Sequence, residues 1–276
     1  MVYGSTGLIG SQLCADLEGV GRVIPCRWSD VMQEKDHSER IRALADLHGD
    51  STVTVIFACG ITDPHEDRSR IMFSNYEFPK MVSSESLAAG NTRYLTIGTI
   101  QETVDRVCSG NAYLESKQLL GKWVANTGAR FKSRFLHLRL HTLYGYKIKR
   151  HMFLGQLLDC LKRGTVFKMS AGTQLREYHW VGDVTGIMKR MLENEWTFGP
   201  VEEISNGGPT RLVDLARGIC KAFGREDLLS VGAIDAPPGE DCARAYKKSD
   251  WWGPGTGTDA VTRITEILKS GSSAWT

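Results

Sequence analysis

The chain has 276 residues, of which 41 % are hydrophobic and 24 % charged, as in an ordinary soluble protein with one large domain and room for a smaller lobe. Its formal net charge is +2, so bulk electrostatics do not indicate a partner such as nucleic acid or a membrane surface. No apolar run approaches the roughly 20 residues that span a bilayer, and the charged and apolar regions of a signal peptide are missing. The seven cysteines are scattered without a Cys-x-x-Cys pair, so we expect reduced thiols in a cytoplasmic protein, with no metal site.

The first motif is a glycine triplet close to the start of the chain. Gly4, Gly7 and Gly10 are followed by an amphipathic run, which predicts a strand that turns into a helix. Such a turn offers free N–H groups and the positive end of a helix dipole to a dinucleotide pyrophosphate. The predicted cofactor-binding loop comprises Gly4, Ser5, Thr6, Gly7, Leu8, Ile9 and Gly10. Since only three residues precede Gly4, either the first strand is unusually short or the numbered chain begins inside it.

A short second strand is expected over residues 22–26. In a dinucleotide-binding fold, the residue that ends this strand meets the adenosine ribose, and a carboxylate there selects NAD. Here the position holds Cys26 followed by Arg27, whose guanidinium suits a 2′-phosphate. The sequence therefore favours NADP, although Arg27 as an idle surface charge is the alternative.

The next strand is a nearly continuous β-branched run over residues 52–58, as expected for a buried parallel strand. It ends in Ala58, Cys59 and Gly60, small residues that a cofactor can pass. Helix 69–89, strand 93–97, helix 111–126 and strand 131–140 follow, and this alternation predicts a doubly wound parallel sheet of the Rossmann type.

Beyond about residue 145 the rhythm changes to shorter elements. We expect residues 1–145 to form an NADP-binding domain and residues 146–276 a smaller α/β substrate lobe, with the chain crossing between the two. The expected elements of this second part are helices 152–162, 183–192, 212–223 and 259–269 and strands 166–169 and 201–204.

Three residues form the chemical core of the sequence. Thr99 follows a strand, where open α/β sheets hold their ligands, and Tyr113 and Lys117 are four apart on one helix face. An ammonium close to a phenol lowers its pKa, so that the tyrosine can exchange a proton, and a threonine hydroxyl can hold the same substrate oxygen. Tyr76 and Lys80 share this spacing, but Pro79 between them favours surface helix packing instead.

The order of the glycine triplet, Asn75, Thr99, Tyr113 and Lys117 resembles the extended short-chain dehydrogenase/reductases, that is, the NAD(P)-dependent epimerase/dehydratase family. Residues 138–145 resemble that family's strand towards the substrate lobe, and residues 172–184 its motif in the second lobe. The resemblance implies catalytic roles for Thr99, Tyr113 and Lys117, a cofactor contact for Asn75 as well as for the two helix residues, and a homodimer through helices 69–89 and 111–126. It also implies a nucleotide-sugar substrate held by Thr99, Ile100, Gln101, His141, Thr142, Arg176 and Arg244.

Arg176 stands where the family's arginine contacts the nucleotide diphosphate, and an ion pair with Glu177 or Asp183 is its alternative. His137, Arg139 and His141 share a strand face, for which a packed, hydrogen-bonded role is expected.

Departures from the family narrow the chemistry. Sugar 4,6-dehydratases of this family carry an Asp-Glu pair directly after the threonine, where this chain has Ile100 and Gln101, which cannot exchange protons. The chain is most similar to nucleotide-sugar 4-ketoreductases, such as the CDP-abequose synthase group, which predicts NADP(H)-dependent reduction of a 4-keto-6-deoxy sugar linked to CDP or dTDP. The alternatives are a nucleotide-sugar epimerase that retains its cofactor and a non-catalytic NADP-binding regulatory protein.

Overall fold

The computed structural model describes residues 1–33, 36–49, 51–63, 65–104, 110–236, 244–253 and 259–269. Cys108 and Cys242 lie outside these residues. The contacts divide the chain into two compact units, Met1–Leu140 with Thr185–Glu203, and His141–Val184 with Ile204–Thr276. No described helix combines the length and the apolar character that crossing a bilayer requires.

The first unit is built on a six-stranded sheet with the order β10-β5-β4-β3-β1-β2. The strand pairs β2/β1, β1/β3, β3/β4 and β4/β5 are all parallel, so the predicted α/β fold class is confirmed. The strand bounds are β1 Val2–Tyr3, β2 Pro25–Cys26, β3 Val53–Phe57, β4 Thr92–Thr99, β5 Phe135–Leu140 and β10 Val201–Ile204.

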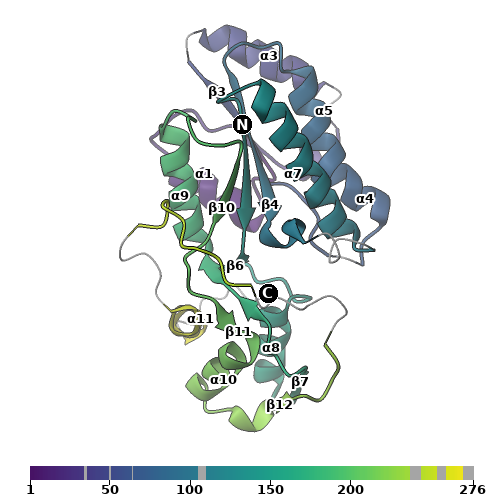
Figure 1. Ribbon diagram of the computed structural model, residues 1–276, viewed down its shortest axis with the longest axis vertical. Coiled ribbons are helices and arrows are strands. Elements are labelled where there is room, and N and C mark those ends of the chain that lie inside the picture. The colour runs from purple at the N-terminus through teal and green to yellow at the C-terminus, as the bar shows by residue number, and fades with distance from the viewer. Residues whose placement is uncertain are drawn as a thin grey trace. The chain divides into compact units, whose positions relative to one another are not determined.

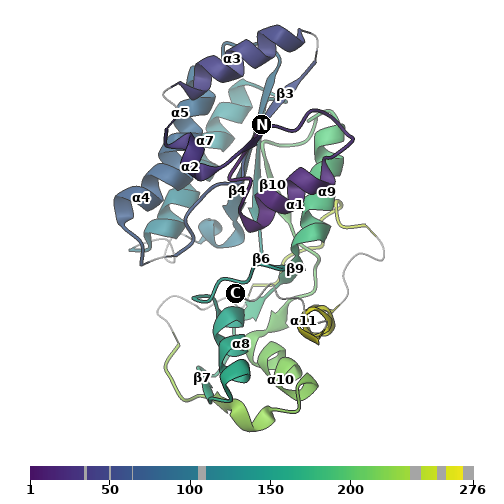
Figure 2. The ribbon, with the colours of Figure 1, turned by 180° about the vertical axis from the view of Figure 1, so that it is seen from behind.

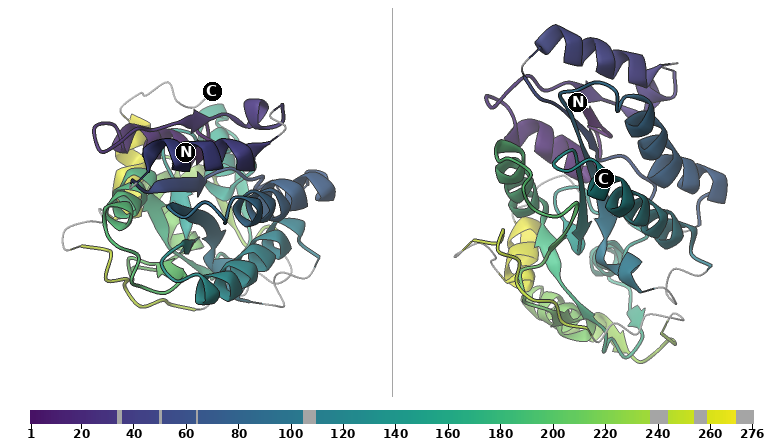
Figure 3. Two further views of the ribbon diagram at one scale, coloured as in Figure 1. Left: turned by 90° about the horizontal axis from the view of Figure 1, so that it is seen from above. Right: turned by 45° about the horizontal axis from the view of Figure 1, so that its top comes forward.

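Helices cover both faces of this sheet. On one face lie α3 (His37–His48), α4 (Arg68–Met72), α5 (Phe78–Glu85) and α7 (Ala112–Arg130) (Figure 1). On the other lie α1 (Leu8–Asp16) and α9 (Val181–Glu193), where the Thr185 hydroxyl donates to the Asp16 carboxylate (Figure 2). The short α2 (Trp28–Val31) follows β2 directly. Figure 3 gives two further views of these layers.

The main core of the first unit lies under α3, α5 and α7. Tyr3 on β1 stacks on Phe57 of β3, and Phe78 of α5 meets Tyr3 edge to face, with ring centroids 5.4 and 5.2 Å apart. All three side chains are at most 2 % exposed. Burying aromatic rings of this size is a large part of what holds the helix layer on the sheet.

The helix predicted over residues 69–89 contains an irregular turn. Residues Phe73–Glu77 form a π-helical turn between α4 and α5, and Pro79 lies in the first turn of α5. Proline lacks the N–H that would bond the carbonyl four residues earlier, so the wider turn absorbs the mismatch.

The second unit is made of helices and small sheets. Its helices are α8 (Phe153–Arg163), α10 (Leu212–Ala222) and α11 (Ala260–Lys269), within one or two residues of the predicted bounds. Its small sheets pair β6 (Thr142–Tyr144) with β9 (Tyr178–Trp180), β8 (Leu175–Arg176) with β11 (Thr210–Arg211), and β7 (Phe167–Met169) with β12 (Leu229–Val231). Single helical turns occur at Glu226–Leu228 (η3) in this unit and at Ile100–Thr103 (η2) in the first unit.

Candidate active site

The end of β4 and the start of α7 bring Thr99, Tyr113 and Lys117 into one place. Thr99 is the last residue of β4, and Asn111 caps α7 by accepting a hydrogen bond from the Leu114 N–H at 3.1 Å. This cap sets Tyr113 in the first turn of the helix and Lys117 one turn later. The Tyr113 hydroxyl is hydrogen-bonded to the Thr99 side chain. The two hydroxyls therefore lie next to each other at the carboxyl end of β4.

Tyr113 is held in its protonated form in this structure. Burial, followed by the negative charge of Glu102, raises the pKa of its hydroxyl to about 12, and the hydrogen bond with Thr99 opposes both effects. Lys117 is only 6 % exposed, and its Nζ donates to the Ile97 carbonyl at 2.8 Å. The ammonium is thus fixed against β4, one helical turn from the phenol.

The glycine loop lies at the carboxyl end of β1. Gly4 has φ +81°, and a Cβ there would lie 2.6 Å from the backbone of Cys59, so only glycine fits this turn. A Cβ on Gly10 would lie 2.2 Å from the Gly4 carbonyl oxygen, which explains the close packing of α1 against the turn. Gly7 precedes the first helical residue, and no side chain of the described chain caps α1 or places an acid in its first turn. The helix start is therefore suited to an anion such as a pyrophosphate.

The loop after β3 passes between the glycine loop and Lys117. A Cβ on Gly60 would lie 2.6 Å from Asn75 Oδ1 and 3.5 Å from Lys117 Nζ. Asn75 is 1 % exposed; its Oδ1 accepts from the Ile61 N–H at 2.8 Å, and its Nδ2 donates to the Ile61 carbonyl at 2.9 Å and to Ser116 Oγ at 3.1 Å. Asn75 therefore fastens this loop to α7, and any effect of Asn75 on a cofactor is exerted through the loop.

Arg27 is exposed directly after β2, and Cys26 beside it is buried. Because the strands run parallel in the order β4-β3-β1-β2, their carboxyl ends line up along one edge of the sheet. Thr99, the Ala58–Gly60 loop, the glycine loop and Arg27 follow each other along that edge in this order.

The residues after Thr99 differ in how far their side chains are exposed to solvent. Ile100 is 7 % exposed and so mostly buried, while Gln101 is partly exposed. Glu102, which the sequence analysis did not single out, is 2 % exposed, and its carboxylate accepts hydrogen bonds from the Thr99 N–H at 3.1 Å and from Arg139 Nε at 2.8 Å. The spacing of Thr99 and Glu102 is that of a capping box, and the structure contains this box, so a sequence signal existed.

The strand face predicted for His137 and Arg139 is present, since both side chains bond Glu102. His141 is different: it lies in the second unit, after the end of β5.

The candidate substrate residues of the second unit gather around β6, β8 and β9. The His141 ring packs edge-on against Tyr246 with centroids 4.9 Å apart, and the Arg244 guanidinium lies 4.7 Å from the centroid of the same tyrosine. Arg176 is partly exposed on β8, and Thr142 begins β6, where its N–H donates to the Glu177 carbonyl at 3.2 Å.

Glu177 is the buried centre of this group. Its carboxylate accepts hydrogen bonds from His179 Nε2 at 2.9 Å, Ser205 Oγ at 2.7 Å and the Asn206 N–H at 2.8 Å. His141 Nε2 lies 3.9 Å from the same carboxylate and finds no hydrogen-bond partner among the described residues.

Burial lowers the pKa of His141 to about 4, although the nearby carboxylate of Glu177 opposes this shift. Among the described side chains, no group of three or more His, Cys, Asp or Glu residues is placed to hold a metal ion.

The alternatives for two other residues can be followed in the structure. Asp183, a possible partner of Arg176, pairs with Arg263 at 3.1 Å. Lys80 Nζ donates to the Tyr76 hydroxyl at 3.1 Å, so this pair is a local contact between the π-helical turn and α5.

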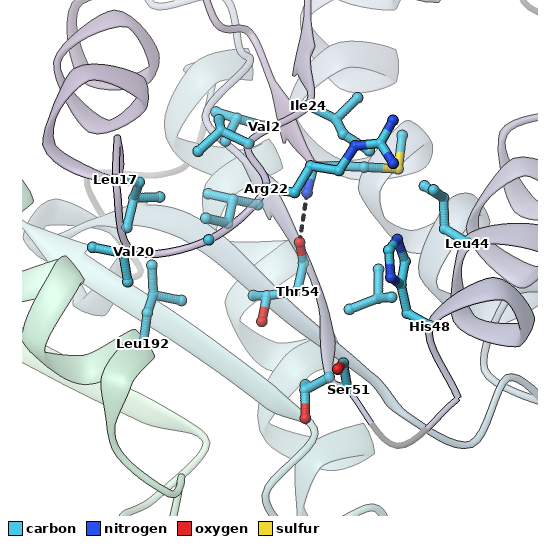
Figure 4. A pocket seen from close by; sticks show the side chains of 16 residues that line it. Val2, Leu17, Val20, Arg22, Ile24, Leu44, His48, Ser51, Thr54 and Leu192 are labelled. Carbon is cyan, nitrogen blue, oxygen red and sulfur yellow. Dashed lines mark hydrogen bonds between the residues drawn. The ribbon is translucent and has the colours of Figure 1, made fainter.

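A pocket of about 460 Å³ lies at the amino ends of the strands (Figure 4). It is lined by Val2, Arg22, Ile24 and Thr54 among others, and it forms where β1 is shorter than β3. The amino group of Met1 donates to the Thr54 carbonyl at 2.8 Å inside it. Since Thr99 and the glycine loop are at the carboxyl ends, this pocket is at the opposite edge of the sheet from the candidate active site.

The sequence comparisons agree with this geometry. The model of the NAD dependent epimerase/dehydratase family matches residues 1–204. The chain belongs to this family. The predicted family is therefore confirmed, and a comparison with curated proteins gave no match.

Solved structures of the family share the fold. A dTDP-glucose 4,6-dehydratase from Bacillus anthracis in complex with NAD is 12 % identical, with a TM-score of 0.75 over 98 % of this chain and 96 % of that one. A UDP-glucose 4-epimerase from Thermus thermophilus in complex with NAD is 14 % identical, with a TM-score of 0.70 over 98 % of each chain. A UDP-glucuronic acid 4-epimerase from Bacillus cereus in complex with UDP-glucuronic acid and NAD is 16 % identical, with a TM-score of 0.73 over 98 % of each chain.

Membership of the family supports an enzyme that uses a nicotinamide dinucleotide.

Proposed function

We propose that this protein reduces the C4 ketone of a nucleotide-linked 4-keto-6-deoxy sugar with NADPH. The observation that carries the proposal is the hydrogen-bonded pair of Thr99 and Tyr113 beside the buried Lys117. A hydroxyl pair of this kind can hold a carbonyl oxygen and give it a proton as negative charge develops there.

The residues directly after Thr99 argue for reduction over dehydration. Ile100 and Gln101 have no proton to exchange, and the carboxylate of Glu102 is bonded to the Thr99 N–H and to Arg139 in the interior. Among the described residues after Thr99, none offers a free carboxylate for eliminating water from the sugar.

The cofactor fits the edge of the first unit. The glycine loop and the uncapped start of α1 would hold the pyrophosphate, and the Ala58–Gly60 loop would pass the nicotinamide half towards Lys117. When bound, the reduced nicotinamide supplies a hydride. Arg27, exposed after β2 with no carboxylate directly after that strand, would pair with the 2′-phosphate of NADP.

The chain's own residues would supply the proton. Thr99 orients the ketone oxygen, Tyr113 gives it the proton, and Lys117 stabilises the phenolate that remains and binds the nicotinamide ribose. Solvent then returns a proton to Tyr113.

The substrate would be recognised mainly by the second unit. Arg176 and Arg244 would pair with the diphosphate, and Thr142 and His141 would contact the sugar. Thr99, Ile100 and Gln101 of the first unit are the other proposed substrate contacts. UDP-glucuronic acid is bound by the similar epimerase from Bacillus cereus, which supports a nucleotide-linked sugar here as well. We also expect a homodimer through α4, α5 and α7.

A nucleotide-sugar epimerase is the second candidate, because two of the similar solved structures are epimerases that hold NAD. An epimerase regenerates its cofactor in each cycle, so it would convert one sugar isomer into another without net consumption of NADPH.

Tyr113→Phe tests the proposal, with Tyr76→Phe as the matched control. Both changes remove one tyrosine hydroxyl from a helix, but the Tyr76 hydroxyl accepts its hydrogen bond from Lys80 of the same helical segment. We expect Tyr113→Phe to lower kcat for ketone reduction by about 100-fold or more while NADPH still binds, and Tyr76→Phe to keep most activity. Full turnover by Tyr113→Phe would contradict the proposal.

A further inference from the structure

A buried charged cluster lies directly behind the Thr99–Tyr113 pair. The Glu102 side chain is 1 % exposed and bonds Arg139 Nε at 2.8 Å, and His137, which is fully buried, lies 3.0 Å away. Arg139 also reaches Glu203 on β10 at 3.3 Å. The cluster therefore joins the turn after β4 to β5 and β10.

The packing of the sheet and α7 leaves space for this carboxylate. A Cβ on Gly98 of β4 would lie 2.5 Å from Glu102 Oε2, and one on Gly121 of α7 would lie 2.4 Å from Oε1. Glycine at both positions leaves the room that the carboxylate occupies. Gln118 of α7 also donates to the Glu102 carbonyl at 3.0 Å.

Glu102 is ionised in this surrounding. Burial alone would raise the pKa of its carboxyl, but hydrogen bonds and charge from His137, Arg139 and the Thr99 N–H outweigh burial and lower it. The His137 ring is hydrogen-bonded on both sides, through Nδ1 to Thr96 Oγ1 at 2.7 Å and through Nε2 to Glu102 Oε1 at 3.0 Å. Two carboxylates, Glu102 and Glu203, bond the guanidinium of Arg139.

Thr99 connects this charge to the phenol. Its N–H donates to Glu102 Oε2 at 3.1 Å, and its side chain is hydrogen-bonded to Tyr113. Lys117 follows Tyr113 by one turn of α7, and its Nζ donates to the Ile97 carbonyl of β4 at 2.8 Å.

We propose that Glu102 is a positioning residue that fixes Thr99 and keeps Tyr113 in its proton-donating form, so that the site favours ketone reduction over alcohol oxidation. This inference rests on the proposed reductase function. In reduction, the ketone carbon receives the hydride of the reduced nicotinamide and its oxygen receives the Tyr113 proton, which yields an alcohol, an oxidised nicotinamide and a phenolate. Oxidation requires that phenolate at the start, and a buried negative charge behind Thr99 disfavours it. The raised pKa of Tyr113, to which burial and then Glu102 contribute, agrees with this direction.

Glu102→Gln tests the proposal because glutamine keeps the shape and an oxygen acceptor for Thr99 but removes the charge. Tyr113 phenolate is measured by ultraviolet absorbance from pH 9 to about pH 12.5, as the difference between each protein and the same protein carrying Tyr113→Phe. We expect the titration of Tyr113 to move about one unit lower in Glu102→Gln, which is about tenfold more phenolate at a fixed pH. With substrate, the basic limb of kcat/KM for reduction moves in the same direction, and alcohol oxidation at pH 8 becomes faster.

Two further variants keep the test decisive. Arg139→Gln removes the compensating cation and should move the Tyr113 titration to higher pH, so it also provides the answer if Glu102→Gln does not fold. Glu203→Gln is the control, because Glu203 is 37 % exposed and bonds Arg139 without touching Thr99, and it should shift the titration far less.

The outcomes separate the two hypotheses. An unchanged phenolate titration in Glu102→Gln and Arg139→Gln, even with a lower melting temperature, would overturn the role of Glu102 and leave it a structural residue. A shifted titration without any turnover of ketones would keep the effect of Glu102 on Tyr113 and overturn the proposed reductase function instead.

Discussion

The same glycine-to-alanine change is expected to have opposite effects in two helices of the first unit. Gly10 lies in α1 and Gly186 lies in α9. A Cβ on Gly10 would lie 2.2 Å from the Gly4 carbonyl oxygen and 2.8 Å from the Gly4 carbonyl carbon, whereas a Cβ on Gly186 meets nothing within 4 Å. The contrast therefore isolates packing from helix propensity.

The magnitudes follow from two opposing terms. Alanine in place of glycine in a helix interior contributes about 1 kcal/mol of stability through propensity. Overpacking costs about 1–3 kcal/mol, and the upper end applies at Gly10 because the atoms in the way are backbone and cannot rotate aside. Gly10→Ala should thus lower the free energy of unfolding by about 2 kcal/mol, and Gly186→Ala should raise it by about 0.5–1 kcal/mol.

Urea unfolding followed by circular dichroism measures both effects. With a slope of about 3 kcal/mol per molar urea, Gly10→Ala should lower the midpoint by about 0.7 M and Gly186→Ala should raise it slightly. Since the displaced atoms belong to the proposed pyrophosphate loop, Gly10→Ala should also weaken NADPH binding about tenfold or more, which calorimetry measures. Equal midpoints for Gly10→Ala and the unmodified protein would refute the close packing of α1 on the Gly4 turn.

Three other predictions concern the cofactor, the second unit and the loop after β3. Arg27→Ala should raise KM for NADPH about 10- to 100-fold and leave KM for NADH unchanged, because one charge-assisted contact to a phosphate is worth about 1.5–3 kcal/mol. An equal rise in KM for both cofactors in steady-state assays would contradict the role of Arg27. Burial lowers the pKa of His141 to about 4, below its ordinary value of 6.5, so the unfolded chain binds more protons than the folded chain between these pH values. Neutral His141 therefore contributes up to about 3 kcal/mol of stability above pH 6.5, and this contribution is lost as the pH falls to 4. In urea unfolding from pH 7 to 4.5, His141→Asn should lose less stability than the unmodified protein, the exposed His151→Asn should match it, and parallel curves for all three would refute a buried neutral His141. Asn75→Ala should lower the free energy of unfolding by about 1–3 kcal/mol, since it leaves the Ile61 N–H and Ser116 without this partner, and an unchanged urea midpoint would show that the loop does not depend on it.

Much of the fold could be predicted because its longer elements carry their own signals. Residues 52–58 are a nearly continuous run of apolar and β-branched residues, and the structure has β3 at Val53–Phe57. Asn111 is a good helix cap, and α7 begins directly after it. Gly164, in the left-handed conformation with φ +67°, ends α8 one residue beyond the predicted end.

The remaining elements depend on contacts between distant residues. β6, β8 and β9 have two or three residues each, too few for a periodic pattern, and each forms through a partner far along the chain. The π-helical turn at Phe73–Glu77 could have been suspected from Pro79, but its exact position depends on the packing of Asn75 against Ile61 and Ser116.

The candidate active site divides in the same way. The spacing of Tyr113 and Lys117 on one helix face was readable, as was the capping box from Thr99 to Glu102. The bonds of Glu102 to His137 and Arg139 were not, because they join residues 35 and 37 positions apart across neighbouring strands.

The most direct test of the proposed function follows deuterium from the cofactor to the sugar. NADPH deuterated at the transferable position of the nicotinamide is mixed with the protein and a CDP- or dTDP-linked 4-keto-6-deoxyglucose, and the product is examined by NMR while absorbance reports NADPH. The account predicts one deuterium at C4 of the sugar for each NADPH consumed, faster than with deuterated NADH. Sugar isomers formed without deuterium at C4 and without loss of NADPH would contradict it and favour the epimerase.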